Sequence, residues 1–152
     1  MSIRLDIEKK YITSVKNKEE SSIKTLRLIK SAIKNKDIAT RTEDNKDGLS
    51  NDQIIILLQS LIKQRNESVE MYKKGGRTNL AESELKEIEI IKSFLPKQLD
   101  EKELTEIVKD IFKNNNFTSI KDMGKVMGIL KSEHSGKIDM SLAGKIVKEY
   151  IK

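Results

Sequence analysis

The stretch Asp122-Met123-Gly124-Lys125-Val126-Met127-Gly128-Ile129-Leu130 combines a helical pattern with residues that weaken a helix. Its apolar residues recur at the i, i+3, i+4 and i+7 spacing of a buried helical stripe: Met123, Val126, Met127 and Leu130. Gly124 and Gly128 lie one turn apart and form a bare strip on one side of this helix. Because each glycine costs about 1 kcal/mol relative to alanine inside a helix, we expect a neighbour to approach this strip more closely than a Cβ would allow.

Two interpretations of the glycine strip remain open at this point. In the first, another helix packs against it, and the small residues Ala143 and Gly144 of the last expected helix would receive it. In the second, a nucleic-acid backbone approaches the strip, attracted by Lys121, Lys125 and Lys131. Taken alone, the glycines favour packing over a ligand.

The composition around this stretch favours an all-α protein. The chain has one Pro, few aromatic residues and no segment with the period-2 alternation of a strand. Capping boxes predict three helix starts, at Ser50 with Gln53, Asn79 with Glu82, and Asp100 with Glu103. After the third start we expect three short helices: 101–114, 119–132 and 139–151.

In the first half of the chain, Ser2 is expected to cap a helix whose apolar stripe is Leu5, Ile12 and Val15. A second helix is expected from Ser21 or Ser22, followed by a polar loop over residues 37–50. The longest helix then begins after Ser50 and ends at Gly75-Gly76, and its apolar segment 54–61 is expected to be buried almost all round.

The sole proline marks the expected domain boundary. Pro96 excludes the α-region for Leu95, and a new capping box follows at once. We therefore expect an N-terminal helical domain over residues 1–95 and a small three-helix tail domain over residues 96–152.

Composition also limits compartment and chemistry. The chain has no cysteine, no apolar run typical of a signal peptide, and no stretch near the roughly 18 apolar residues of a membrane span. We therefore expect a cytoplasmic protein without membrane contact. The net charge of +6 is concentrated at the two ends, since residues 1–40 carry ten basic and five acidic groups and residues 117–152 carry seven and four. Basic ends suit an extended anionic partner, although such an excess commonly serves only solubility.

Residues with catalytic or metal-binding chemistry are sparse. The single histidine, His134, lies in a predicted turn without a second ligand at helical spacing, so neither a metal site nor a cofactor is expected. Glutamates 82, 84, 87 and 89 are spread around a helix and are expected to form a solvated face. Three arginines stand apart in this lysine-rich chain, Arg27, Arg65 and Arg77, because a guanidinium binds a carboxylate or a phosphate through two parallel hydrogen bonds. Pairing of Arg27 or Arg65 with Glu67, Glu84 or Glu87 is the alternative to phosphate binding.

Five short motifs resemble the YqeY family of small bacterial proteins in order and spacing. They are Thr25-Leu26-Arg27, Lys63-Gln64-Arg65-x-Glu67-Ser68, Tyr72-x3-Gly76-Arg77, Leu95-Pro96-x-Gln98-Leu99 and Asp122-Met123-Gly124-Lys125-Val126-Met127-Gly128. The second half also resembles the tail domain of the GatB subunit of the tRNA-dependent amidotransferase.

This resemblance implies a link to tRNA. In the amidotransferase, the tail contacts the body of the tRNA, whereas the chemistry lies in other domains and another subunit. A family-level label of carbon–nitrogen ligase activity with glutamine as amido-N-donor would describe those parts, which this chain lacks. The resemblance makes Lys125 the expected phosphate contact, with Gly124 and Gly128 allowing close approach.

The sequence therefore predicts a non-catalytic tRNA-binding protein whose RNA-binding residues are Lys121, Gly124, Lys125, Gly128, Lys131, Arg27, Arg65 and Arg77. We expect shape and phosphate contacts rather than base stacking, because the aromatic residues on helices look core-facing. Two alternatives remain: an accessory protein that docks on a tRNA synthetase or amidotransferase, and an enzyme with glutamine-dependent turnover.

Overall fold

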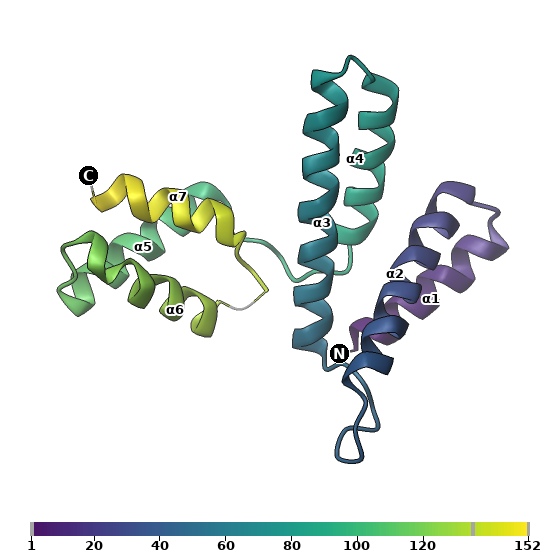
Figure 1. The fold of residues 1–152 in the computed structure, drawn as a ribbon, viewed down its shortest axis with the longest axis horizontal. Helices are drawn as coiled ribbons and strands as arrows, with labels where there is room; N and C mark the ends of the chain where they lie inside the picture. Colours follow the sequence, from purple (N-terminus) through teal and green to yellow (C-terminus); the bar gives the residue numbers. More distant parts are fainter. Residues whose placement is uncertain (1, 135, 152) are drawn as a thin grey trace. The chain divides into compact units, whose positions relative to one another are not determined.

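The computed structural model describes residues 2–134 and 136–151, and this part of the chain is helical without a strand (Figure 1). The helices are α1 (Ile3–Lys16), α2 (Glu20–Thr40), α3 (Asn51–Lys74), α4 (Thr78–Lys92), α5 (Glu101–Asn115), the 3-10 helix η1 (Ile120–Asp122), α6 (Met123–Glu133) and α7 (Met140–Ile151). The all-α class is thereby confirmed. The chain divides into two compact units, Met1–Leu95 with α1–α4 and Pro96–Lys152 with α5–α7. Among the described helices, none has both the length and the hydropathy that crossing a membrane requires.

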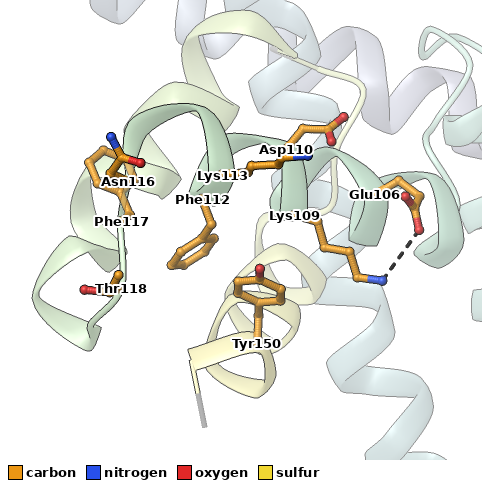
Figure 2. A pocket seen from close by; sticks show the side chains of 9 residues that line it. All are labelled: Glu106, Lys109, Asp110, Phe112, Lys113, Asn116, Phe117, Thr118 and Tyr150. Carbon is orange, nitrogen blue, oxygen red and sulfur yellow. Dashed lines mark ion pairs between the residues drawn. The ribbon is translucent and has the colours of Figure 1, made fainter.

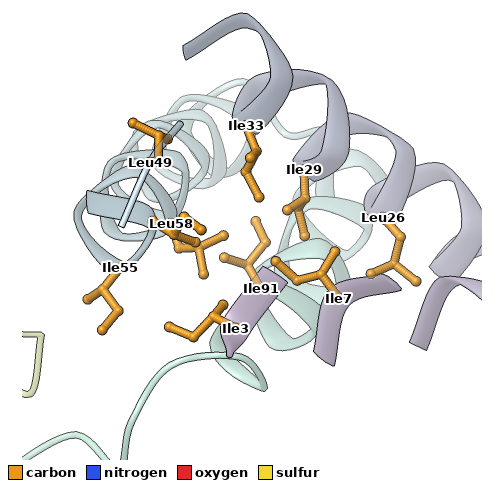
Figure 3. Packing of buried hydrophobic residues seen from close by; sticks show 10 residues of the cluster. Ile3, Ile7, Leu26, Ile29, Ile33, Leu49, Ile55, Leu58 and Ile91 are labelled. Atoms are coloured by element: carbon orange, nitrogen blue, oxygen red, sulfur yellow. The ribbon is translucent and has the colours of Figure 1, made fainter. Parts of the chain in front are cut away.

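The core of the first unit lies where its four helices meet. The α1 and α2 helices pack as one pair, and α3 and α4 form a helical hairpin (Figure 1). Each helix contributes side chains that are almost fully buried, among them Ile7, Leu26, Ile29, Leu58 and Ile91. Figure 3 shows these aliphatic side chains converging between the helices. The unit is therefore held together chiefly by burial of aliphatic surface.

Two of the three predicted capping boxes are present. The Ser50 N–H donates to Gln53 Oε1 over 2.9 Å, and the Glu103 N–H donates to Asp100 Oδ1 over 2.7 Å. The box predicted at Asn79 is wrong, because α4 begins two residues earlier than a cap at Asn79 implies, with Arg77 at the N-cap position and no side-chain cap. The second helix likewise begins before the predicted serines, at Glu20.

The apolar face predicted for α1 is wrong. Leu5 is 60% exposed, and Ile12 and Val15 are also exposed, whereas Ile3 and Ile7 are buried. Both sets have helical spacing, so the choice between them is made by packing against the other helices rather than by α1 itself.

The α3 helix is also more exposed than predicted. Ile54, Ile55 and Leu58 are buried, but Ile56 is 53% exposed. Neighbouring helices cover only one side of α3, and the apolar run is longer than that side requires.

The loop predicted over residues 37–50 is shorter, because α2 continues to Thr40. Asp37 therefore lies on the helix, where its carboxylate accepts hydrogen bonds from Arg4 Nη1 and from the Leu49 N–H, each 2.8 Å long. Arg4 Nη2 also donates to the Leu49 carbonyl over 3.2 Å. These bonds, which we call the Arg4–Asp37 clamp, tie α1, α2 and the loop before α3 together.

The clamp predicts a specific response to acid. The hydrogen bond from Arg4 holds the pKa of Asp37 below its ordinary value, with a further contribution from the Leu49 N–H. A lowered pKa contributes stability that is present above the unfolded-state pKa of about 3.9 and is lost as pH falls through the folded-state pKa. Urea unfolding gives the free energy of unfolding of wild type and of Asp37→Asn at pH 7 and at about pH 2.5. We expect the two proteins to differ less in this free energy at the lower pH. Equal differences at both pH values would contradict the clamp.

In the second unit, α5, α6 and α7 surround a separate core. Its fully buried members come from all three helices: Leu104, Val108, Val126, Leu130, Ala143 and Val147. The stripe predicted on α6 is confirmed, since Val126 and Leu130 are buried and Met123 and Met127 pack against the same core. The opposite side of α6 is thereby directed away from the core.

The start of the second unit is attached to the segment between α6 and α7. Gln98 Nε2 donates to the Pro96 carbonyl over 2.9 Å and to the Gly136 carbonyl over 2.6 Å. The Leu99 N–H donates to the Lys137 carbonyl over 2.8 Å. The Pro96-x-Gln98-Leu99 motif thus fixes the chain at the entry to the three-helix bundle.

Candidate functional site

The glycine strip of α6 faces open space. Gly124 and Gly128 are exposed, and a Cβ built on either residue would meet nothing within 4 Å. The packing interpretation is therefore wrong for the described chain. Ala143 is buried in the core. A Cβ built on Gly144 would lie 3.9 Å from the methyl carbon of Met123, so Gly144 lies near that side chain.

Two lysines share this side of α6, and a third, Lys121, lies in η1 just before it. Positions 124, 125, 128 and 131 fall on one face of α6, opposite the buried stripe. We call Lys121, Gly124, Lys125, Gly128 and Lys131 the glycine–lysine face. All three lysines are exposed, and no ion pair to them is found among the described residues.

Among the described residues, the nearest carboxylates in the sequence form no ion pair with the lysines of this face. Asp122 accepts hydrogen bonds from the Thr118 and Ser119 N–H groups, 3.1 and 3.3 Å long, and so closes the turn before the helix. Glu133 is nine residues after Gly124, which places it about half a turn away around the helix axis. The glycine–lysine face therefore presents positive charge around a strip of bare backbone, an arrangement suited to a polyanion.

An aromatic hollow lies beside this face. Its volume is about 540 Å³, and Figure 2 shows its lining residues: Glu106, Lys109, Asp110, Phe112, Lys113, Asn116, Phe117, Thr118 and Tyr150. The Phe112 ring centroid lies 4.7 Å from that of Tyr150 and 6.4 Å from that of Phe117. Tyr150 is 44% exposed, so the expectation that helical aromatic residues face the core is wrong for this tyrosine.

Lys125 connects the face and the hollow. Its Nζ lies 5.9 Å from the centroid of the Phe117 ring, within the range of a cation–π contact. The residue expected to contact phosphate is therefore held at the edge of the aromatic hollow. Sequence reasoning missed this hollow, because Phe117 and Tyr150 are far apart in the chain and meet only through α5 and α7.

The three arginines lie in the other unit and have different surroundings. Arg65 Nε is 3.0 Å from Glu87 Oε2, and both side chains are largely buried, so this pair links α3 and α4 as the intramolecular alternative predicted. Arg27 is exposed and its Nε donates to the Tyr11 hydroxyl over 3.4 Å. Arg77 is exposed at the start of α4. The structure places none of them within the unit that carries the glycine–lysine face.

The described residues hold no group of three or more His, Asp or Glu side chains arranged for a metal ion. His134 ends α6, where its N–H donates to the Leu130 carbonyl. Exposed amines and the partly exposed rings of Phe117 and Tyr150 are the groups that this unit presents at the glycine–lysine face and the hollow.

Comparison with known proteins gives one family match and two relatives. The model of the family described as Yqey-like protein matches residues 4–151. A Lachancea thermotolerans protein named "Altered inheritance of mitochondria protein 41, mitochondrial" is 35% identical over 94 residues, which are 62% of this chain and 46% of that protein. An uncharacterized Schizosaccharomyces pombe protein is 28% identical over 90 residues, which are 59% of this chain and 69% of that protein. The matched region thus spans less than half of the first relative, and the similarity extends to eukaryotic proteins.

Proposed function

The chain belongs to the Yqey-like protein family, and from that membership we propose that it is a non-catalytic accessory protein that binds tRNA through its glycine–lysine face. The observation that carries the proposal is the pair Gly124 and Gly128, which face open space between exposed lysines. Two helix-weakening residues without a packing role are explained when a ligand backbone must come close to the helix.

The dimensions of the face support an extended anion. Lys125 and Lys131 are six residues apart on α6, which corresponds to about 9 Å along the helix at 1.5 Å per residue, and Lys121 lies in η1 just before α6. Amines spread over that length can contact more than one phosphate of a nucleic-acid strand. Such contacts position an RNA without reading its sequence.

The resemblance to the tail domain of the amidotransferase supports tRNA as the RNA. On this proposal the protein presents or retains tRNA for a partner in aminoacylation or amidation, and bond-forming chemistry belongs to that partner. Its working compartment is then one that contains tRNA, which we take to be the cytoplasm.

Substitution of the two glycines tests the proposal. Gly124→Ala with Gly128→Ala is expected to raise the free energy of unfolding by about 1 kcal/mol per site, because alanine favours a helix and no neighbour is displaced. Gly124→Gln with Gly128→Gln is expected to remain folded and to bind total tRNA roughly tenfold more weakly, about 1.4 kcal/mol. Its longer side chains hold the RNA backbone away from the helix.

Urea unfolding measures the first effect and fluorescence anisotropy with labelled tRNA the second. Asn114→Gln, at an exposed position near the end of α5, is the matched control and should bind as wild type does. Unchanged affinity of the double glutamine variant would show that no ligand approaches the strip.

A second candidate function is supported by the outer face of α1. Leu5, Ile12 and Val15 are exposed there, as an accessory protein that docks on a tRNA synthetase or amidotransferase would require. This alternative predicts that wild type binds no tRNA by itself but forms a complex with the purified enzyme, which Leu5→Lys with Ile12→Lys abolishes.

A further inference from the structure

We propose that the aromatic hollow receives one unpaired nucleobase of the RNA that docks on the glycine–lysine face. This inference rests on the proposed function and deepens it, because it names the part of the RNA that is recognised. It assigns a stacking role to Tyr150 and Phe117.

The hollow contains one buried ring, at its base, and two partly exposed rings beside it. Phe112 is 3% exposed and forms the floor, packed at 4.7 Å against Tyr150 and at 6.4 Å, edge to face, against Phe117. Tyr150 keeps 44% of its surface exposed, and Phe117 is half-buried. Figure 2 shows the three rings gathered from α5, α7 and the segment after α5. Tyr150 is the most exposed of the three rings and is the one most available for a nucleobase to stack on.

The rim supplies polar groups for the edge of a base. Asn116 has a left-handed backbone conformation, with φ of 55°, and ends α5, and Thr118 follows two residues later. Both residues are exposed and line the hollow. An amide and a hydroxyl together offer donors and acceptors to a base edge. The volume of about 540 Å³ lies within the range of pockets that hold small organic molecules, about 300–1,000 Å³.

The charges of the hollow favour a neutral ring with a nearby phosphate over a free polyphosphate. Glu106 and Asp110 line one side, and Lys109 is paired with Glu106 at 3.7 Å. Lys109 and Lys113 balance these two carboxylates, so the lining has no excess of positive charge to hold a compact, highly charged anion. Lys113 remains at the rim, exposed and without an ion pair among the described residues, and can contact the phosphate attached to a bound base.

Lys125 makes the hollow continuous with the docking face. Its side chain belongs to the glycine–lysine face, and its Nζ lies 5.9 Å from the Phe117 ring centroid. This distance allows an RNA strand whose phosphate is bound by Lys125 to place a neighbouring base beside Phe117. Unpaired nucleotides can enter the hollow, whereas bases within a duplex remain stacked on their neighbours.

The test compares the binding of two RNAs by three proteins and uses a fourth protein as a fluorescence reporter. The RNAs are a fluorescein-labelled stem-loop with an unpaired loop and the same stem as a blunt duplex. The proteins are wild type, Tyr150→Leu, which keeps apolar packing on Phe112 but removes the ring, and Tyr150→Phe, which keeps the ring. A further variant, Tyr150→Trp, adds a direct reporter, because the chain contains no other tryptophan. Circular dichroism checks that each variant retains its helices.

We expect wild type and Tyr150→Phe to bind the stem-loop more tightly than the duplex. Tyr150→Leu should bind the stem-loop roughly tenfold more weakly, as loss of one base–aromatic stack predicts, and should bind the duplex unchanged. The unlabelled stem-loop should quench the tryptophan fluorescence of the Tyr150→Trp variant, and the unlabelled duplex should not. Equal binding of both RNAs by all proteins would overturn the stacking role and leave the docking face intact. Absence of binding to either RNA by wild type would overturn the docking face, and the stacking role with it.

Discussion

Leu58→Ala is expected to lower the free energy of unfolding by about 3 kcal/mol, within the range for removing a buried leucine side chain. Leu58 is fully buried at the centre of the four-helix unit, where it packs with side chains such as Ile29 and Ile91 (Figure 3). Truncation leaves a cavity that helices fixed by other contacts can fill only in part. Urea unfolding followed by far-ultraviolet circular dichroism measures the effect.

Ile56→Ala is the matched control, two residues away on the same helix. Ile56 is 53% exposed, and alanine is the better helix former, so the change is expected to stay within about 0.5 kcal/mol. An equal decrease in the free energy of unfolding for the two variants would mean that α3 is covered on both sides, contrary to the structure.

Gly48→Ala is expected to destabilise the protein by about 3 kcal/mol or more. Gly48 has a φ of +82°, and a Cβ there would lie 2.8 Å from Asp37 Cγ and in conflict with Asp37 Oδ1. Alanine therefore adds the cost of a left-handed backbone, about 1–3 kcal/mol. It also displaces the carboxylate that binds Arg4 and the Leu49 N–H, and bonds to charged groups contribute about 1.5–3 kcal/mol each.

Gly76→Ala separates these two causes. Gly76 has a similar φ of +72°, but a Cβ there would meet nothing within 4 Å. Only the backbone cost of about 1–3 kcal/mol remains. The transition temperature of thermal unfolding should therefore be much lower for Gly48→Ala than for Gly76→Ala. Equal transition temperatures would show that the Arg4–Asp37 clamp contributes nothing to stability.

The features of the fold that could be predicted are those set by local chemistry. Capping at Ser50 and Asp100 depends on residues three positions apart, and the α6 stripe depends on one helical period. Each lies within about one or two turns of chain, so no knowledge of the other helices is needed.

The features that were predicted wrongly depend on contacts between distant residues. The α1 helix carries two apolar sets of helical spacing, and α2 and α3 determine that Ile3 and Ile7 are the buried ones. Asp37 resembles a loop residue by composition, but Arg4, 33 residues away, gives its carboxylate a partner on the helix. The spacing of residues along the sequence does not indicate which distant residues will contact one another.

The candidate site shows the same division. The helical spacing of Gly124, Gly128 and the three lysines is visible in the sequence, but whether a neighbour covers the glycines is not. The open space beside them, and the meeting of Phe117 with Tyr150 around Phe112, follow only from the packing of α5, α6 and α7.

Binding of total tRNA across a salt series, by wild type, Lys125→Glu and Lys102→Glu, tests the central claim most directly. Lys102 is exposed on α5 outside the glycine–lysine face, so its variant carries the same charge change at a different place. We predict that wild type and Lys102→Glu bind with a logarithmic salt slope of roughly −0.7 to −0.9 per phosphate contacted, and that Lys125→Glu binds more weakly with a shallower slope. An affinity that does not change with salt, or equal binding by all three proteins, would contradict an RNA-docking role for the glycine–lysine face.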